Sequence, residues 1–131
     1  MKRRTAREKA FQALFQMDIN DIPPRESIAN VLEEGIMTDK FLETIVFGVT
    51  EHKESIDEQI QQHLEKWTIK RVASVEKTLL RMATFEMGYV EDVPNKVALN
   101  EAIELAKVFG DDQSGRFING VLKKVLDSYE Q

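Results

Sequence analysis

The stretch VASVEKTLLRMATFEMGY, residues 72–89, carries apolar side chains at nearly every helical turn. These side chains recur at spacings of three and four residues, which is the period of an α-helix rather than of a β-strand. The sequence therefore predicts a helix from Val72 to Tyr89. Because apolar residues occupy most of its circumference, such a helix needs neighbours on several sides, and we expect it at the centre of the fold. Its apolar positions are Val75, Leu79, Leu80, Met82, Ala83, Phe85 and Met87.

The same spacing recurs along most of the chain, whereas the alternation typical of strands is nearly absent. Prolines, glycines and residues that cap helices separate the apolar segments. The prediction is an all-α fold, a compact bundle of about seven helices that forms a single domain over residues 1–131. Three further helices are predicted in the first half: 5–19, a short one from Pro24 to near Gly35, and one that is capped by Thr38 or Asp39 and ends near His52. The next covers 56–64 and has a capping box at 55–58. Two more cover 95–109, where Gly110 ends the helix, and a segment that is capped within 111–114 and ends near Tyr129.

Composition excludes several classes of protein. The 131 residues include no cysteine, which removes disulfide bonds, thiol nucleophiles and cysteine-ligated zinc. Apolar residues make up 42% and charged residues 31%, as in ordinary globular proteins, so we expect a folded chain. No segment approaches the roughly 20 apolar residues that span a bilayer, and no uninterrupted apolar run follows the basic N-terminus. We therefore expect a cytoplasmic protein with no membrane contact.

No pattern typical of an active site is evident. His52 and His63 lie on different predicted helices without the spacing of metal ligands, and Glu101 and Glu104 fit a charged helix surface. The segment GDDQSG, residues 110–115, lacks the lysine of a phosphate-binding loop and follows a predicted helix, so it is interpreted as a turn. We expect no enzymatic activity, no catalytic residue, no metal and no cofactor.

Charge is distributed unevenly along the chain. The first nine residues carry five cations and one acid, although the net charge is −5, which leaves about −9 on the other 122 residues. A basic end on an acidic body points to a polyanion as partner, because cations that neutralise phosphates release condensed counterions. A solvated terminus with no partner is the alternative that charge alone leaves open. The five cations are Lys2, Arg3, Arg4, Arg7 and Lys9.

Helical geometry places Arg3 and Arg7 on the same side as Ala10 and Leu14, which belong to the apolar stripe of the first helix. Burying a guanidinium group there carries a large desolvation penalty. We therefore expect the first turns to extend beyond the globule and to present Arg3, Arg4 and Arg7 beside another element. Arginine suits RNA recognition, because its planar group binds phosphate and stacks on unpaired bases.

A second candidate RNA-binding region lies at the start of the last helix, where Gln113, Ser114, Arg116 and Phe117 follow the predicted cap. The free backbone N–H groups of a helix N-terminus attract phosphate. An aromatic ring beside them can stack on an unpaired base. The alternative is that Phe117 packs against the first helix.

Six segments carry a family resemblance: RRTARE (3–8), ALF (13–15), VEKTLLRMA (75–83), DVP (92–94), NEAIELAK (100–107) and FINGVL (117–122). In this order, and over nearly the whole chain, they resemble the NusB family of bacterial transcription antitermination factors. The resemblance implies two perpendicular three-helix bundles. It implies binding to the single-stranded boxA element of ribosomal RNA transcripts together with NusE, a small-subunit ribosomal protein. It also implies that the pair joins RNA polymerase with NusA and NusG and suppresses premature termination.

The resemblance also implies roles for individual residues. The arginine-rich start and the second region match RNA contacts of the family, although Gln113 stands where relatives can carry an acid. Phe15 and Glu86 match contacts with NusE. The predicted RNA-binding residues are Lys2, Arg3, Arg4, Arg7, Gln113, Ser114, Arg116 and Phe117.

Charge supports the same partner, because a basic ribosomal protein is attracted to an acidic body. We therefore expect the pair, rather than this chain alone, to bind boxA tightly. A homodimer sealed by exposed apolar side chains could hide the basic end. Two other functions stay open: kinship with the NusB-like RNA-binding domain of ribosomal RNA cytosine methyltransferases, and a helical scaffold that binds only protein. An active methyltransferase is disfavoured, because the sequence contains no Rossmann-like cofactor domain and no cysteine nucleophile.

Overall fold

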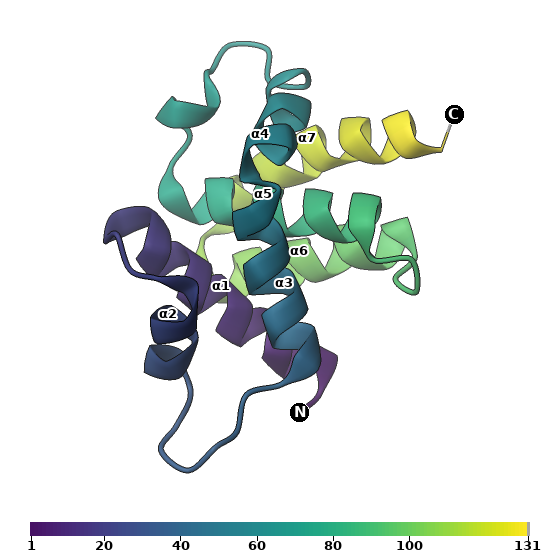
Figure 1. Cartoon of the computed structure of the whole chain (residues 1–131). Helices are drawn as coiled ribbons and strands as arrows, with labels where there is room; N and C mark the ends of the chain where they lie inside the picture. The colour runs from purple at the N-terminus through teal and green to yellow at the C-terminus, as the bar shows by residue number, and fades with distance from the viewer. Residues whose placement is uncertain (131) are drawn as a thin grey trace.

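Seven α-helices and one short 3-10 helix make up the computed structural model, which describes residues 1–130 (Figure 1). Within this range there is no strand, no helix long and apolar enough to cross a membrane, and no residue cluster placed to hold a metal ion. The predicted all-α class and the approximate number of helices are confirmed. The helices are α1 (Arg3–Ile19), α2 (Pro24–Val31), α3 (Lys40–Glu51), α4 (Lys53–Gln61), the 3-10 helix η1 (Ile69–Arg71), α5 (Ser74–Tyr89), α6 (Asn95–Phe109) and α7 (Asp112–Tyr129).

Six of the seven α-helices of the described residues form two groups of three. Helices α1, α2 and α3 contact one another, and so do α5, α6 and α7. Helix α5 also contacts α1, α3 and α4, so it joins the two groups. Its predicted central position is confirmed, because Leu79 and Leu80 are fully buried and Met82, Ala83 and Phe85 are at most 4% exposed.

Local capping residues set the starts of two predicted helices. The Asp39 carboxylate accepts hydrogen bonds from the backbone N–H groups of Phe41 and Leu42 at the start of α3. The Asp111 carboxylate accepts one from the Ser114 N–H at the start of α7. Such a bond satisfies an N–H group that the first helical turn leaves without a partner, which is why these two boundaries could be predicted.

The predicted start of α4 is wrong. The helix begins at Lys53 instead of Ile56, and the predicted capping box at 55–58 lies within it. Continuity with α3 sets its start: the His52 N–H donates to the Gly48 carbonyl, and the His52 carbonyl accepts from the Ile56 N–H. His52 thus takes part in the backbone hydrogen bonds of both helices, and no side-chain cap forms.

An ion-pair network fastens α1 and α4 to α5. The Arg81 guanidinium donates to both Asp57 oxygens, at 2.8 and 2.9 Å, and to one Asp18 oxygen at 3.3 Å. The Ser74 hydroxyl donates to the other Asp18 oxygen at 2.9 Å, and Lys77 Nζ lies 3.6 Å from that oxygen. Burial opposes ionisation of Asp18, but the Ser74 hydrogen bond and the charges of Lys77 and Arg81 outweigh it and lower its pKa.

Replacing Asp18 with asparagine is expected to lower the free energy of unfolding by about 1–2 kcal/mol near neutral pH. The folded-state pKa lies below the ordinary value of 3.8, so ionised Asp18 stabilises the fold at pH values above 3.8. This stabilisation is lost as the pH falls through the lowered pKa, because protonation removes the ion pairs.

Urea denaturation of the wild type and Asp18→Asn, at about pH 7 and about pH 3, measures this difference. The difference between the two proteins should be smaller at the lower pH than at the higher one, because Asp18 is ionised to a smaller extent there. Asp21→Asn, an exposed neighbour in the chain, is the control and should match the wild type at both. A difference that persists unchanged in acid would refute the assignment.

Candidate nucleic-acid interface

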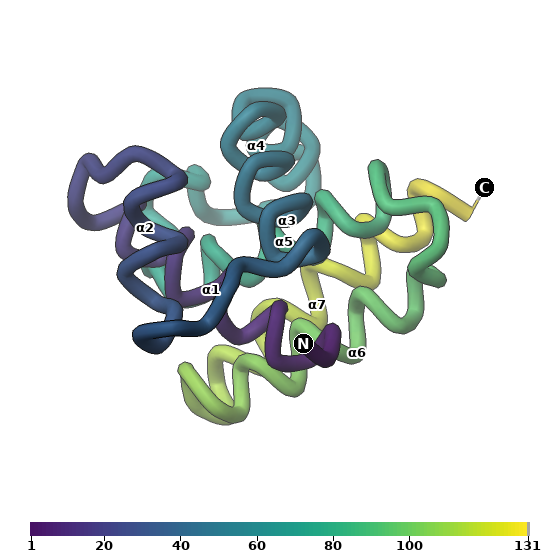
Figure 2. The backbone as a smooth tube through the Cα atoms, turned by 60° about the horizontal axis from the view of Figure 1, so that its bottom comes forward, coloured from purple at the N-terminus to yellow at the C-terminus, as the bar shows by residue number. Residues whose placement is uncertain are grey.

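The N-terminal basic cluster consists of Lys2, Arg3, Arg4 and Arg7, at the start of α1 and beside α6 (Figure 2). The first three residues of this cluster are exposed. The Arg3 guanidinium donates to Asp92 at 2.7 Å, and Arg4 donates to Glu101 at 3.3 Å. Asp92 lies in the α5–α6 connection and Glu101 on α6, so both exposed arginines are already paired with carboxylates of the second helical group.

Arg7 is buried, at 3% exposed, and the prediction that it is presented to solvent is wrong. Its Nε and Nη2 donate to the Glu86 carboxylate at 3.0 and 2.7 Å, and its Nη1 lies 3.7 Å from Glu101. These charge-assisted hydrogen bonds offset much of the desolvation penalty on which the prediction relied. Arg7 therefore holds α1 against α5 and is not a free cation.

Glu86, predicted to contact a partner protein, is also buried, at 2% exposed. Burial raises the pKa of its carboxyl, and the hydrogen bonds and charge of Arg7 lower it only in part, so the net shift is upward. Within this chain the side chain faces Arg7, and the predicted contact of Glu86 with a partner protein stays a prediction. Through Arg7, Glu86 also holds α1 in position.

Phe41, at the start of α3, is a site residue that the sequence did not reveal. Its ring centroid lies 4.4 Å from the Arg3 guanidinium carbon and 5.0 Å from that of Arg7. The N-terminal ammonium lies 3.5 Å from the Asp39 carboxylate beside it. Cation–π and ionic contacts thus fix the first turn of α1. No local pattern indicates them, because Phe41 fits the apolar stripe of its own helix.

At the start of α7, a backbone N–H group that the sequence suggested was free to bind phosphate already has a partner. The backbone N–H of Ser114 donates to Asp111, and this hydrogen bond lowers the pKa of the Asp111 carboxyl. Asp112 adds a second acid to the first turn. Both acids oppose the predicted attraction of phosphate to this helix end, which stays a prediction. Gln113 and Arg116 remain exposed, whereas Ser114 is only 7% exposed.

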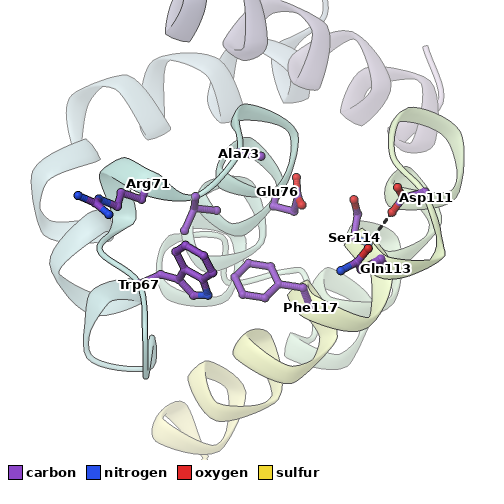
Figure 3. A pocket seen from close by; sticks show the side chains of 9 residues that line it. Trp67, Arg71, Ala73, Glu76, Asp111, Gln113, Ser114 and Phe117 are labelled. Carbon is purple, nitrogen blue, oxygen red and sulfur yellow. Dashed lines mark hydrogen bonds between the residues drawn. The ribbon is translucent and has the colours of Figure 1, made fainter.

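Phe117 lies half-buried beside Trp67, and both side chains line a cavity of about 360 Å³ between α7 and the α4–α5 connection (Figure 3). The aromatic side chain that packs against α1 is instead Phe109, whose ring centroid lies 4.4 Å from that of Phe11. Trp67 was missed as a site residue, because its place in the sequence indicated only a break between helices.

Phe15, the other predicted partner contact, lies half-buried at the end of an aromatic stack. Its ring centroid is 5.6 Å from that of Phe11, which stacks on Phe109 in turn. The ring borders a surface groove together with Val31 and Val75. The position is accessible from outside, so it stays a candidate for contact with another protein.

Helix α6 connects the two candidate RNA-binding regions. Two residues of α1 contact α6: Arg4 pairs with Glu101 in the middle of α6, and Phe11 stacks on Phe109 at its end. The segment from Glu101 to Phe109 spans about 12 Å of helix, and α7 begins just beyond it. A single-stranded RNA in an extended conformation that reached from one region to the other would run along α6.

A model of the NusB family matches residues 4–127 of the chain. The transcription antitermination protein NusB of Bacillus cereus (strain B4264) is 53% identical over 129 residues, which cover 98% of this chain and 99% of that protein. NusB of T. maritima superposes with a TM-score of 0.87 at 34% identity, covering 97% of this chain and 92% of that chain. A crystal structure of antitermination factors NusB and NusE in complex with dsRNA matches with a TM-score of 0.87 at 29% identity, covering 97% of both chains.

Proposed function

Since this chain belongs to the NusB family, we propose that it acts as a transcription antitermination factor that binds boxA RNA of ribosomal RNA transcripts together with a NusE-type ribosomal protein. The observation that carries the proposal is the 53% identity to a transcription antitermination protein over nearly the full length of both chains. The solved complex of a relative with NusE and RNA supports the two kinds of partner.

The proposed RNA contacts are the exposed residues of the two regions that border α6. Arg3 and Arg4 are 49% and 63% exposed, so their guanidinium groups are accessible to phosphate even while they pair with acids. Arg7 positions them through Glu86 rather than touching RNA. The proposed contacts are Lys2, Arg3 and Arg4 on α1 and its start, and Gln113, Ser114, Arg116 and Phe117 on α7.

The proposed protein partner is basic, because the chain carries a net charge of −5 and five of its 18 cations lie within the first nine residues, which leaves the remaining body acidic. Complementary charge speeds association and orients the two surfaces. Phe15, in its aromatic stack, is the proposed apolar contact. The pair would then join RNA polymerase with NusA and NusG in the cytoplasm. The mechanism involves no bond chemistry: the bound transcript stays tethered to polymerase, which raises the effective concentration of the complex near the enzyme.

A binding titration tests this proposal. Fluorescently labelled boxA oligoribonucleotide is titrated with this chain, with the NusE-type protein, and with both together. We expect the pair to bind boxA more tightly than either protein alone and more tightly than it binds a scrambled oligonucleotide. Equal affinity with and without the partner would refute cooperation, and a pair that forms without any boxA preference would indicate a protein-only scaffold. Light scattering in the same samples would detect a homodimer that dissociates when RNA binds.

A further inference from the structure

Trp67, the single tryptophan of the chain, is 53% exposed in the connection between α4 and η1. A lone exposed aromatic side chain needs no special explanation. The backbone around Trp67, however, is fixed by one side chain: Gln61 Nε2 donates to the Trp67 carbonyl at 3.0 Å, and Gln61 Oε1 accepts from the Ile69 N–H at 2.8 Å. The side-chain amide of Gln61 thus binds the backbone on both sides of Thr68, at Trp67 and at Ile69.

The segment before Trp67 is attached as well. Lys124 of α7 donates to Glu65 at 2.8 Å, and Val72 beyond the 3-10 helix is 8% exposed, so it anchors the other end in the core. With its backbone held in this way, the indole is kept at the surface next to Phe117. These contacts therefore hold Trp67 at the surface, and the face of its indole ring is in place before a ligand stacks on it.

Trp67 and Phe117 stand between two hollows, because both side chains line each of them. Figure 3 shows the first of the two. The first, of about 360 Å³, is bordered by Arg71, Gln113 and two acids, Glu76 and Asp111. The second, of about 340 Å³, is bordered by three cations, Lys66, Arg116 and Lys124, and by Glu65, which pairs with Lys124. The two aromatic rings thus separate a hollow with hydrogen-bonding groups from one in which cations outnumber acids.

This combination fits a flat ligand that has hydrogen-bonding edges and is joined to anions. An unpaired nucleotide has this chemistry: its base stacks on aromatic rings, its edge binds amide or carboxylate groups, and its phosphates bind guanidinium groups. Glu76 and Gln113 can accept from and donate to a base edge. Arg71 and Arg116 lie at the two hollows, where phosphates on either side of the base would pass. A purely apolar peptide would leave these polar groups without partners.

We propose that Trp67 and Phe117 form a base-binding pocket, in which one unpaired base of the bound RNA stacks on the indole while Arg71 and Arg116 bind the flanking phosphates. The pocket rests on the RNA-binding function proposed above and extends it to the α4–α5 connection. It adds Trp67 and Arg71 to the RNA-contacting surface, beyond the N-terminal basic cluster and the start of α7.

Tryptophan emission provides a direct test, because Trp67 is the only indole in the chain. The full-length protein is titrated with boxA oligoribonucleotide while its emission and the anisotropy of labelled RNA are followed in parallel, alone and with a NusE-type partner that lacks tryptophan. We expect RNA to quench the emission over the same concentration range that raises the anisotropy. RNA binding with unchanged emission would overturn the pocket and leave the proposed function standing. Absence of any RNA binding, with or without the partner, would instead overturn the proposed function itself.

Variants separate stacking from other roles of Trp67. Trp67→Ala should lower RNA affinity by about 5- to 100-fold, whereas Trp67→Phe, which keeps a ring, should retain most of the affinity. Ile19→Ala removes a side chain that is 57% exposed and should leave binding unchanged. Circular dichroism checks that each variant is folded. Wild-type affinity in folded Trp67→Ala, or quenching by the partner alone equal to that by RNA, would overturn the proposal.

Discussion

Replacing Glu86 with alanine lowers the free energy of unfolding by about 3–5 kcal/mol, the effect expected when one member of a buried ion pair is removed. Arg7 would then remain buried, at 3% exposed, without its main partner. Glu101 compensates only in part, because its nearest oxygen lies 3.7 Å from Arg7 Nη1 and its carboxylate also pairs with Arg4. Urea denaturation followed by circular dichroism measures the change.

Two controls show whether the unpaired charge causes this loss. The double variant Arg7→Met and Glu86→Leu removes both charges and fills the space, so it should recover much of the lost stability. Glu104→Ala breaks an exposed ion pair with Lys107 and should change the unfolding free energy by about 0.5 kcal/mol or less. If Glu86→Ala were as mild as Glu104→Ala, the buried pair would not hold α1 in place.

Removing the exposed cations of the N-terminal basic cluster should weaken RNA binding by about tenfold or more at low salt and flatten its salt dependence. In the triple variant Lys2→Ala, Arg3→Ala and Arg4→Ala, the slope of log K against log salt should fall by about 2, since each phosphate contact with single-stranded RNA contributes about 0.7. Arg7 is retained, because its loss would destabilise the fold and obscure the result. Anisotropy titrations of boxA RNA over a series of salt concentrations measure both quantities.

The matched variant for this experiment is Asp92→Asn. Asp92 pairs with Arg3 at 2.7 Å, so its neutralisation should release that arginine and strengthen RNA binding by about two- to fivefold. The two variants are therefore expected to act in opposite directions. A triple variant that kept the wild-type salt slope would exclude the N-terminal basic cluster as a phosphate-binding site.

Features that depend on neighbouring residues could be predicted from the sequence. The caps at Asp39 and Asp111 and the bounds of α6 follow from hydrogen bonds and turn residues within a few positions of one another. The burial of α5 follows from its composition. In each case the deciding interactions lie within one segment of the chain.

Features that depend on distant residues could not be predicted. Arg7 and Glu86 are 79 positions apart, so no local pattern pairs them, and the desolvation penalty taken alone predicts an exposed arginine. The position of Trp67 depends on Gln61 and on the packing of η1 against the core. The predicted start of α4 is wrong for a related reason, since α4 follows α3 directly through His52 and has no side-chain cap.

The carboxylates that pair with Arg3 and Arg4 have a consequence for selectivity in a cell crowded with RNA. An incoming polyanion meets Asp92 and Glu101 beside the two exposed guanidinium groups and competes with them for these cations. A single phosphate that meets the end of α1 exchanges one anionic neighbour for another and gains little. Only a strand that engages several sites at once gains enough to stay bound, so stray transcripts are poor competitors for this surface.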